Sequence, residues 1–483
     1  MYARCRPLLQ RVAAIAAVAL AQAAIAGSAS AQATDLAALA DKTFAAYDSS
    51  NSPGCAVGID RAGEPRFTHA YGSANLEFDI PITPATIFEA GSVSKQFTAA
   101  ATVLLALDGK LRLEDDVRKY IPELPRYDRT ITIRHLLNHT SGLRDWGEIV
   151  DLEGWPRGTR AFTQEDVLQV IQRQRVLNYP VGDRYAYTNS GYNLLAMIVT
   201  RVSGMSFPDF VHDRIFAPLG MTHSGWRDDY TRIVKGRAQA YSKGADGWRL
   251  DMPFEKVYGN SSLLSTVSDL LTWTAVLDHP TPPWRAMAES LHVRGVLTNG
   301  DTSVYAMGLV LGTYRGLHTV EHNGATAGYR SQLVNYPGKG LTMAVLCNVG
   351  DVDPRAETRA MTDVLLAGDL AARPAPNPPR KAPPSWTPGA RDLADAAGEY
   401  YSPEVLSTVK LSVQNGALVL FRAPAASATT VTLKPAASRD HYTGFGTGGP
   451  ADEVWFTRGA DGRVNAMHVR TVRAFDVVYE RIR

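Results

Sequence analysis

The sequence predicts two folded parts, a large α+β domain followed by a small all-β domain. Three observations support this division. Strand-like segments occur near both ends of the first part, with mostly helical segments between them. A proline-rich stretch then interrupts the chain. Beyond it, apolar and polar positions alternate in short runs that are typical of strands. With 483 residues, the chain is long enough for two or three domains.

Residues 1–31 have the features of a secretory signal peptide. Three arginines form a positive n-region, residues 12–26 form an apolar h-region, and residues 29–31 form a small-residue cleavage site. A membrane anchor would need about 20 apolar residues, more than this run provides. We therefore expect cleavage at about Ala31 and a periplasmic or secreted protein. No other segment is apolar enough to span a bilayer.

We assign residues 32–371 to the α+β domain. Its strand-like segments are 54–59, 66–71, 305–311, 317–322, 329–336 and 341–349. Its helical segments are 96–107, 133–137, 192–202 and 268–277, with a last helix over 357–370. Strands from both termini around a helical middle predict an antiparallel sheet covered by helices.

Residues 372–391 form the expected linker, because its prolines favour extended backbone that builds no core. Residues 392–483 are expected to form a small β-barrel of eight or so short strands. Asn415-Gly416 is the strongest hairpin signal, and Asp461-Gly462 predicts a second turn. The strands expected around these turns and at the end of the chain are 408–413, 417–421, 454–457, 464–469 and 472–479.

Charge and cysteine content exclude several classes of function. The net charge is +2, from 50 basic and 48 acidic residues, so nothing indicates a nucleic acid or an anionic membrane as partner. After cleavage the chain keeps Cys55 and Cys347, each in a strand-like run. A disulfide is compatible with an oxidising compartment, but we favour two buried free thiols. Two cysteines make neither a disulfide framework nor a cysteine metal site.

The segment Ser92-Val93-Ser94-Lys95 places a hydroxyl and an amine three residues apart at the start of an expected helix. Residues i and i+3 share one helix face, about 5–6 Å apart at their Cβ atoms. Lys95 can therefore take the proton of Ser92 and activate it as a nucleophile. The alternative is that Ser92 only caps the helix. A second copy of the spacing, Ser407 to Lys410, lies in an expected strand, where the two side chains point to opposite faces.

Tyr187-Thr188-Asn189 precedes an apolar helical run. A tyrosine is a credible acid or base if a nearby ammonium lowers its pKa. Asn189 can donate to a substrate carbonyl and accept from Lys95. The same spacing recurs at Tyr258 and Asn260, so the pattern alone is weakly specific. The structural alternative for Tyr187 is a half-buried side chain at a helix entry.

His322-Asn323-Gly324-Ala325 ends one strand-like segment and leads toward the next. Gly324 would let a substrate backbone come close to the strand edge. The N–H groups of Ala325 and Ser92 can form an oxyanion hole, which is worth about 10²–10³ in rate per donor. For His322, a satisfied histidine at a strand end is the alternative.

We expect no metal and no other cofactor. The sequence has no His-Glu-x-x-His helix, and it has no Gly-x-Ser-x-Gly elbow, which argues against an α/β-hydrolase. His135 and His139 are spaced as two ligands on one helix face, but a third ligand is missing, so we expect structural roles for them. The expected partner is a small-molecule or peptide substrate. The sequence does not fix an oligomeric state.

The three motifs occur in the order found in the class C β-lactamase-like serine hydrolases, the S12 peptidase family, which this chain resembles over roughly residues 35–370. The region beyond the linker is similar to the lipocalin-like barrel of some members. The resemblance implies a β-lactamase and penicillin-binding-protein-like fold, with Ser92 acylated and Lys95 and Tyr187 sharing proton transfer. The substrate-binding residues it implies are Asn189, His322, Gly324 and Ala325.

One departure from that family bears on the substrate. Class C β-lactamases and penicillin-binding proteins carry Lys-Thr-Gly where this chain has His322-Asn323-Gly324. A lysine is a permanent charge for a substrate carboxylate, whereas histidine, with a pKa of about 6.5, is mostly neutral at pH 7. Histidine at this position resembles D-aminopeptidases, D-amino-acid-specific peptidases and some esterases. We therefore expect an exported hydrolase of amides, including D-amino-acid peptides, or of esters. The alternatives are a β-lactamase or DD-peptidase-type enzyme, and a penicillin-binding sensor or scaffold without turnover.

Overall fold

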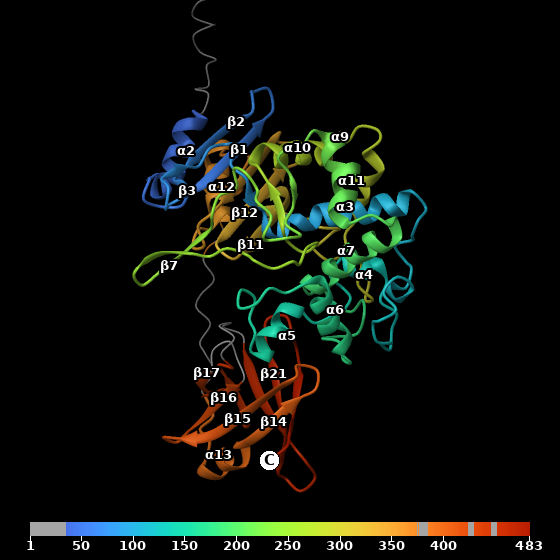
Figure 1. Cartoon of the computed structure of the whole chain (residues 1–483), viewed down its shortest axis with the longest axis vertical. Coiled ribbons are helices and arrows are strands. Elements are labelled where there is room, and N and C mark those ends of the chain that lie inside the picture. Colours follow the sequence, from blue (N-terminus) through green and yellow to red (C-terminus); the bar gives the residue numbers. More distant parts are fainter. Residues whose placement is uncertain (1–34, 374, 376–384, 424–428, 446–451) are drawn as a thin grey trace, which may run out of the picture.

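The computed structural model describes residues 35–373, 375, 385–423, 429–445 and 452–483. The expected signal peptide and most of the expected linker lie outside these residues. Figure 1 shows an α+β part that contains a sheet and two groups of helices, with a β-barrel below it. This arrangement confirms the predicted fold class.

A six-stranded antiparallel sheet joins the two ends of the α+β part. Its strand order is β10-β11-β12-β13-β1-β2, so strands from the N-terminal end lie beside strands from the C-terminal end (Figure 1). The strands are β1 (Cys55–Arg61), β2 (Phe67–Tyr71), β10 (Val310–Tyr314), β11 (Leu317–Thr326), β12 (Tyr329–Tyr336) and β13 (Leu341–Cys347).

Both faces of this sheet are covered by helices. Helices α2 (Leu36–Phe44) and α12 (Pro354–Leu365) cover one face, and α10 (Val267–Asp278) covers the other. Alternate residues of β13 belong to different cores, because successive strand side chains point to opposite faces. Met343 packs in the core that contains Met361 of α12, whereas Ala344 packs in the core that contains Leu271 of α10.

The remaining helices form a second group beside the sheet. Helix α3 (Ser94–Leu107) is buried from Ser94 to Leu105 and packs against α7 and α11. A helix buried on all sides is positioned by its neighbours and not by solvent. The other helices of this group are α4 (Ile133–Leu137), α5 (Trp146–Glu153), α6 (Gln164–Arg173), α7 (Asn189–Ser203), α8 (Phe207–Val211), α9 (Ala217–Leu219) and α11 (Arg285–Leu291).

Short strands and turns connect these layers. A three-stranded sheet of β5, β9 and β6 lies next to the segment that leads into α3. The short strands are β3 (Ser73–Asn75), β4 (Ile80–Pro81), β5 (Phe88–Glu89), β6 (Gly225–Trp226), β7 (Tyr241–Gly244), β8 (Gly247–Leu250) and β9 (Leu263–Ser265).

The C-terminal part is a nine-stranded antiparallel sheet that curls into a nearly closed barrel, with α13 (Ala390–Ala396) beside it. Asn415 and Gly416 have φ angles of 51° and 75°, as the predicted hairpin turn requires. The strands are β14 (Gly398–Ser402), β15 (Ser407–Gln414), β16 (Ala417–Ala423), β17 (Thr429–Thr432), β18 (Lys434–Pro435), β19 (His441–Thr443), β20 (Glu453–Arg458), β21 (Val464–Arg470) and β22 (Val477–Arg481).

Several predicted element limits are wrong. The last strand begins at Val477 and not at Val472, because residues 471–476 form a loop that binds the α+β part. The strand predicted from Tyr305 begins only at Val310. Helix α12 begins at Pro354, because the Asp353 side chain caps it. The predicted turn residues Asp461-Gly462 lie in the connection of five residues between β20 and β21, where the predicted strands left six.

The two cysteines correct another prediction. Cys55 and Cys347 lie directly opposite each other on the neighbouring strands β1 and β13 and form a disulfide. The expectation of free thiols was wrong because strand register decides this pairing, and the two positions are 292 residues apart in sequence. The bond ties the first strand of the sheet to the last strand of the α+β part.

Within the described residues, no single helix is long and apolar enough to cross a membrane. Helix α7 and the segment Phe207–Leu219 meet the length and composition test only as a pair, bent by 82° at the break between them.

Candidate active site

Ser92 lies in a short 3₁₀ turn, Gly91–Val93, directly before α3. The prediction that it opens the α-helix is therefore off by one turn. The consequence for the side chains is as expected, because Lys95 lies in the first turn of α3. Its Nζ atom is 3.1 Å from the Ser92 Oγ atom. The second copy of this spacing, Ser407 to Lys410, lies in strand β15, as predicted.

The Lys95 amine has three polar neighbours. Besides Ser92 Oγ, they are Asn189 Oδ1 at 3.0 Å and the Asn260 carbonyl oxygen at 2.7 Å. A neutral amine has two N–H groups and one lone pair. It can therefore donate to the two pure acceptors, Asn189 Oδ1 and the Asn260 carbonyl, while it accepts a hydrogen bond from the Ser92 hydroxyl. In the neutral state, the lone pair of the amine then faces the proton of the Ser92 hydroxyl.

Burial also favours the neutral amine. The Lys95 side chain is fully buried, and desolvation holds its pKa well below the usual range of a lysine. The guanidinium of Arg473, which comes from the barrel, lowers the pKa of Lys95 further. The Asp145 carboxylate opposes both effects but does not outweigh them. Burial and Arg473 thus both favour the neutral amine, which is the form that can accept a proton.

Tyr187 differs from the sequence prediction in its protonation. Burial raises the pKa of Tyr187 well above its usual value, and this effect outweighs the lowering by Ser92 and Arg473. The sequence made Tyr187 a credible acid or base if a nearby ammonium lowered this pKa, but Lys95, at 4.7 Å from the ring centroid, itself tends to be neutral. Among the described groups, the Tyr187 hydroxyl has no hydrogen-bond partner of standard geometry. Tyr187 is therefore a phenol that can donate a proton.

Asn189 is the first residue of α7, whose preceding residue Thr188 caps the helix. Its backbone N–H donates to the Asp145 carboxylate at 2.6 Å, and its Oδ1 atom accepts from Lys95. No hydrogen bond involves its Nδ2 group within the part of the chain that the structure describes. That group is free to donate to a substrate carbonyl.

Two glycines let β11 approach the Ser92 segment closely. A Cβ atom on Gly91, which has a φ of 51°, would lie 2.6 Å from the Ala325 nitrogen. A Cβ atom on Gly324 would clash with the Ala90 carbonyl oxygen and lie 2.9 Å from the Ser92 nitrogen. Gly324 therefore makes room for the protein's own backbone. The sequence analysis had suggested that it makes room for a substrate backbone. The close approach brings the Ser92 and Ala325 N–H groups to one place.

His322 lies inside β11 and not at its end. Its Nδ1–H donates to the Asn323 carbonyl at 2.7 Å, and the Tyr305 hydroxyl donates to its Nε2 atom at 3.0 Å, a tautomer assigned from these partners. Burial lowers the pKa of His322 to about 3. The imidazole is thus neutral, as the sequence analysis expected. Its two nitrogens are already engaged by the protein.

The other two histidines that the sequence analysis considered, His135 and His139, have different surroundings. His135 closes a capping box with Thr132 at the start of α4. His139 is fully buried, and its ring centroid lies 4.4 Å from that of Tyr187 and 4.5 Å from that of Tyr305. In the described residues, no three His, Cys, Asp or Glu side chains are grouped as metal ligands.

These side chains surround a cavity of about 320 Å³. It contains the predicted Ser92, Tyr187, Asn189, His322 and Ala325. Lys95 and Gly324 are not among the residues that line it. Its lining residues are Ser92, Arg157, Tyr185, Tyr187, Asn189, Asn260, Ser261, Tyr305, Val310, His322, Asn323, Ala325 and Arg473.

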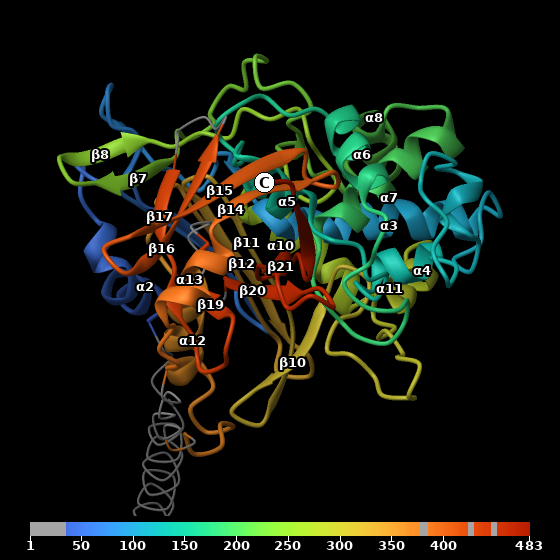
Figure 2. The ribbon, with the colours of Figure 1, turned by 90° about the horizontal axis from the view of Figure 1, so that it is seen from below.

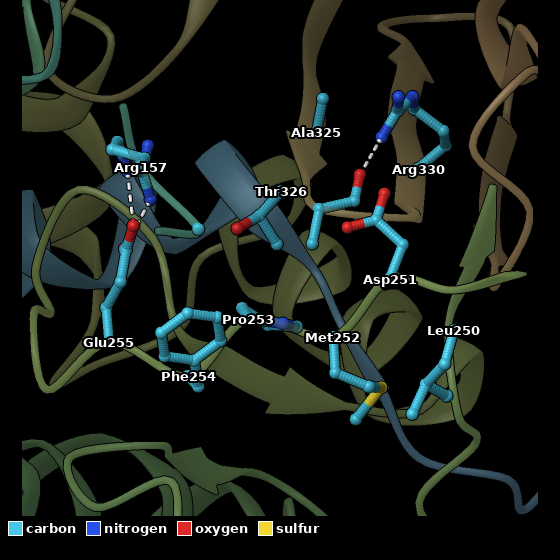
Figure 3. A pocket seen from close by; sticks show the side chains of 12 residues that line it. Arg157, Leu250, Asp251, Met252, Pro253, Phe254, Glu255, Ala325, Thr326 and Arg330 are labelled. Carbon is cyan, nitrogen blue, oxygen red and sulfur yellow. Dashed lines mark hydrogen bonds and ion pairs between the residues drawn. The ribbon is translucent and has the colours of Figure 1, made fainter. Parts of the chain in front are cut away.

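A second cavity of about 440 Å³ adjoins the first and shares Arg157 and Ala325 with it. Figure 3 shows the Arg157–Glu255 ion pair on one of its walls and Arg330 with Asp251 on another. It runs along the end of β11. Past Glu321, β11 has no pairing with β10, so this edge of the strand is open toward the cavities among the described residues.

Sequence reasoning missed several residues of the site, and three of them matter most for its arrangement. Asn260 belongs to the second Tyr-x-Asn pattern, which was noted but set aside, and its carbonyl oxygen contacts Lys95. Tyr305 fixes His322 and lies in a segment that was assigned to a strand. Arg473 lines the cavity from the barrel, where a strand was also expected. Only the repeated Tyr-x-Asn pattern was a usable signal.

The chain matches a known family and several known proteins. Residues 37–367 match the sequence model of the Beta-lactamase family. The chain is similar to a D-aminopeptidase of Gluconobacter oxydans, with 28% identity over 296 residues, which are 61% of this chain and 56% of that protein. It is also similar to Penicillin-binding protein 4* of Bacillus subtilis, with 31% identity over 59% of this chain and 66% of that protein. This chain thus spans less than two thirds of the length of either relative.

The fold also matches a solved structure. An octameric penicillin-binding protein homologue from Pyrococcus abyssi aligns with a TM-score of 0.60 and 23% identity, covering 92% of this chain and 100% of that chain. At this identity the match concerns the fold. It extends over the barrel as well as over the α+β part.

Gly324→Ala is expected to reduce the rate of hydrolysis by about 10²-fold or more, because a methyl group there pushes the Ala325 N–H away from Ser92. Steady-state kinetics with the best substrate measures the effect. Gly368→Ala is the matched control, since Gly368 is exposed and has no atom close to an added Cβ. Equal activity of the Gly324 variant and wild type would contradict this account of the strand approach.

Proposed function

Because the chain belongs to the Beta-lactamase family, we propose that it is a serine hydrolase of amide bonds that works through an acyl-enzyme on Ser92. The observation that carries the proposal is the buried Lys95 amine, 3.1 Å from the Ser92 hydroxyl and held by two further acceptors. An amine in this position can activate a serine nucleophile. It contributes little to apolar packing. Burying a lysine costs free energy of folding, so a functional role accounts for its presence better than packing does.

In the proposed acylation step, Ser92 Oγ attacks the scissile carbonyl carbon and its proton passes to Lys95 Nζ. The negative charge that develops on the carbonyl oxygen is held by the N–H groups of Ser92 and Ala325. The free Nδ2 group of Asn189 donates to a second carbonyl of the substrate and orients it. The C–N bond breaks as the leaving amine receives a proton.

Tyr187 is the proposed donor of that proton. Its raised pKa keeps it a phenol at neutral pH, and apart from the neighbouring Ser92 its hydroxyl has no hydrogen-bond partner among the described groups. The proton that Lys95 gained from Ser92 then restores the tyrosine. Water attacks the ester on Ser92 in the second half of the cycle, with Lys95 and Tyr187 again carrying the proton.

The substrate class is proposed as short peptides or amides, including those with D-amino acids. A similar chain is named a D-aminopeptidase, and His322 is neutral where a fixed charge would favour β-lactams. The second cavity and the open edge of β11 offer room for the acyl part of such a substrate. Esters are the nearest variant, because the same acyl-enzyme forms from them.

We also propose that the protein is exported and that its signal peptide is cleaved at about Ala31. The Cys55–Cys347 disulfide supports this, since such bonds persist in oxidising compartments.

A substrate panel with a Ser92→Ala variant tests the proposed activity. D- and L-amino-acid amides, D-Ala-D-Ala peptides, nitrocefin and a short-chain nitrophenyl ester are compared. We expect turnover of an amide or peptide, a loss of about 10³-fold or more in the variant, and an acyl adduct on Ser92 by mass spectrometry.

Unchanged activity of Ser92→Ala would overturn the mechanism. Efficient nitrocefin turnover at low enzyme concentration would favour a β-lactamase. Stoichiometric labelling of Ser92 by a fluorophosphonate without turnover of any substrate would favour a sensor.

For export, we expect the protein recovered from its native host to begin at about Gln32 and to contain no free thiol when denatured without reductant. N-terminal sequencing and a thiol assay measure this. A full-length cytosolic protein with three free thiols, those of Cys5, Cys55 and Cys347, would contradict the proposal.

A further inference from the structure

The barrel contributes a side chain to the catalytic cavity. Arg473 lies in the loop between β21 and β22 and lines the cavity together with Ser92 and His322. Its guanidinium carbon is 5.1 Å from the ring centroid of Tyr187. Figures 1 and 2 both show the barrel against α5.

The backbone of this loop is fixed to the α+β part. The carbonyl of Arg473 accepts from the Asp145 N–H at 3.2 Å and from Asn178 Nδ2 at 3.0 Å. The Phe475 N–H donates to Asn178 Oδ1 at 2.7 Å. Three hydrogen bonds to two neighbouring loops therefore set where the Arg473 side chain begins.

A buried ion pair holds the two parts together next to the loop. Arg144, whose side chain is 1% exposed, forms an ion pair with Glu404 of the barrel at 2.5 Å. It also donates to the carbonyls of Phe475 and Asp476. Breaking a buried pair leaves an uncompensated charge, so this contact strongly disfavours undocking of the barrel.

The guanidinium itself is uncommitted. No hydrogen bond involves the Arg473 side chain within the described residues, and its ion-pair partner there, Asp145, is 4.0 Å away and already accepts from the Asn189 N–H. The side chain is 38% exposed, toward the cavity. Its N–H groups are therefore available to a ligand.

The other cationic side chains that line the cavity cannot take this role. Arg157 is bound bidentately by the Glu255 carboxylate, at 2.7 and 2.6 Å. His322 is neutral and has both nitrogens engaged. Among the described lining residues, Arg473 is the one fixed charge that is free to bind an anion.

We propose that Arg473 binds the free carboxylate of the amino acid that leaves from the scissile bond. This inference rests on the proposed function, because it takes Tyr187 as the donor of a proton to the leaving nitrogen. In an amino acid the carboxylate carbon lies about 2.5 Å from that nitrogen, and the Arg473 guanidinium carbon lies 5.1 Å from the centroid of the Tyr187 ring. A guanidinium matches a carboxylate in geometry and charge.

This proposal changes the substrate expected from sequence. The neutral His322 lacks the fixed charge that would bind the free carboxylate of a substrate. Arg473 supplies such a charge from the barrel. The preferred substrates are then short peptides that end one residue after the scissile bond, and amino-acid amides are poorer.

Two matched substrates test this, D-alanyl-glycine and D-alanyl-glycinamide, which differ only in the carboxylate of the leaving residue. We expect Arg473→Gln to lower kcat/KM for the carboxylate substrate about 10- to 100-fold more than for the amide. Arg473→Lys restores part of this difference. Arg473 also lowers the pKa of Lys95, but at one pH that effect acts equally on both substrates and cancels in their ratio. Arg463→Gln, at an exposed barrel arginine, is the control and leaves the ratio unchanged.

An equal loss for both substrates, or no loss for either, would overturn the proposal while leaving the hydrolase intact. A wild type that cleaves the amide but not the carboxylate substrate would do the same. If neither substrate is turned over, the readout is fluorophosphonate labelling of Ser92. Glycine should then slow labelling of wild type more than glycinamide does, and should lose this advantage in Arg473→Gln. Equal protection by the two would overturn the inference.

Discussion

The burial of one amine organises this site. Lys95 is fully enclosed by α3, the start of α7 and the Asn260 segment, and each of these supplies or supports one of its polar neighbours. In such surroundings an ammonium is unfavourable, and each unit by which a pKa falls corresponds to about 1.4 kcal/mol. Giving up the proton avoids that cost. The lone pair of the neutral Lys95 amine then faces the Ser92 hydroxyl. Desolvation is therefore what would make Lys95 a base toward Ser92.

The sheet and the helices can meet next to Ser92 because two glycines leave room for the neighbouring backbone. Gly91 and Gly324 bring β11 against the Ser92 turn, which places the sheet's N–H groups beside the nucleophile. Asp145 then connects the site with the barrel. Its carboxylate holds the Asn189 N–H, and its own N–H donates to the carbonyl of Arg473. The barrel is thus part of the same hydrogen-bonded unit as the proposed catalytic residues.

Local patterns predicted what depends on local geometry. The i, i+3 relation of Ser92 and Lys95 and the strand character of Ser407–Lys410 follow from the period of each element. The sheet of strands from both termini follows from their order along the chain. What the sequence did not predict depends on contacts between distant segments, where register and docking decide. The Cys55–Cys347 pair is such a contact.

Arg473 is the clearest example of this limit. Its segment alternates like a strand, but the hydrogen bonds to Asn178 and Asp145 hold it as a loop. The pKa of Tyr187 is a second example. A neighbouring lysine suggests a lowered pKa, and only the depth of burial shows that desolvation prevails for both residues.

The most direct test is the pKa of Lys95 itself, measured by following the ¹³Cε chemical shift in lysine-labelled protein across pH. A Lys95→Met variant assigns the resonance. The account predicts a midpoint well below the ordinary lysine value of about 10.4, with hydrolysis lost as the pH falls through that midpoint, because protonation removes the base. A midpoint at or above about 10.4, with activity unaffected by protonation of Lys95, would contradict it.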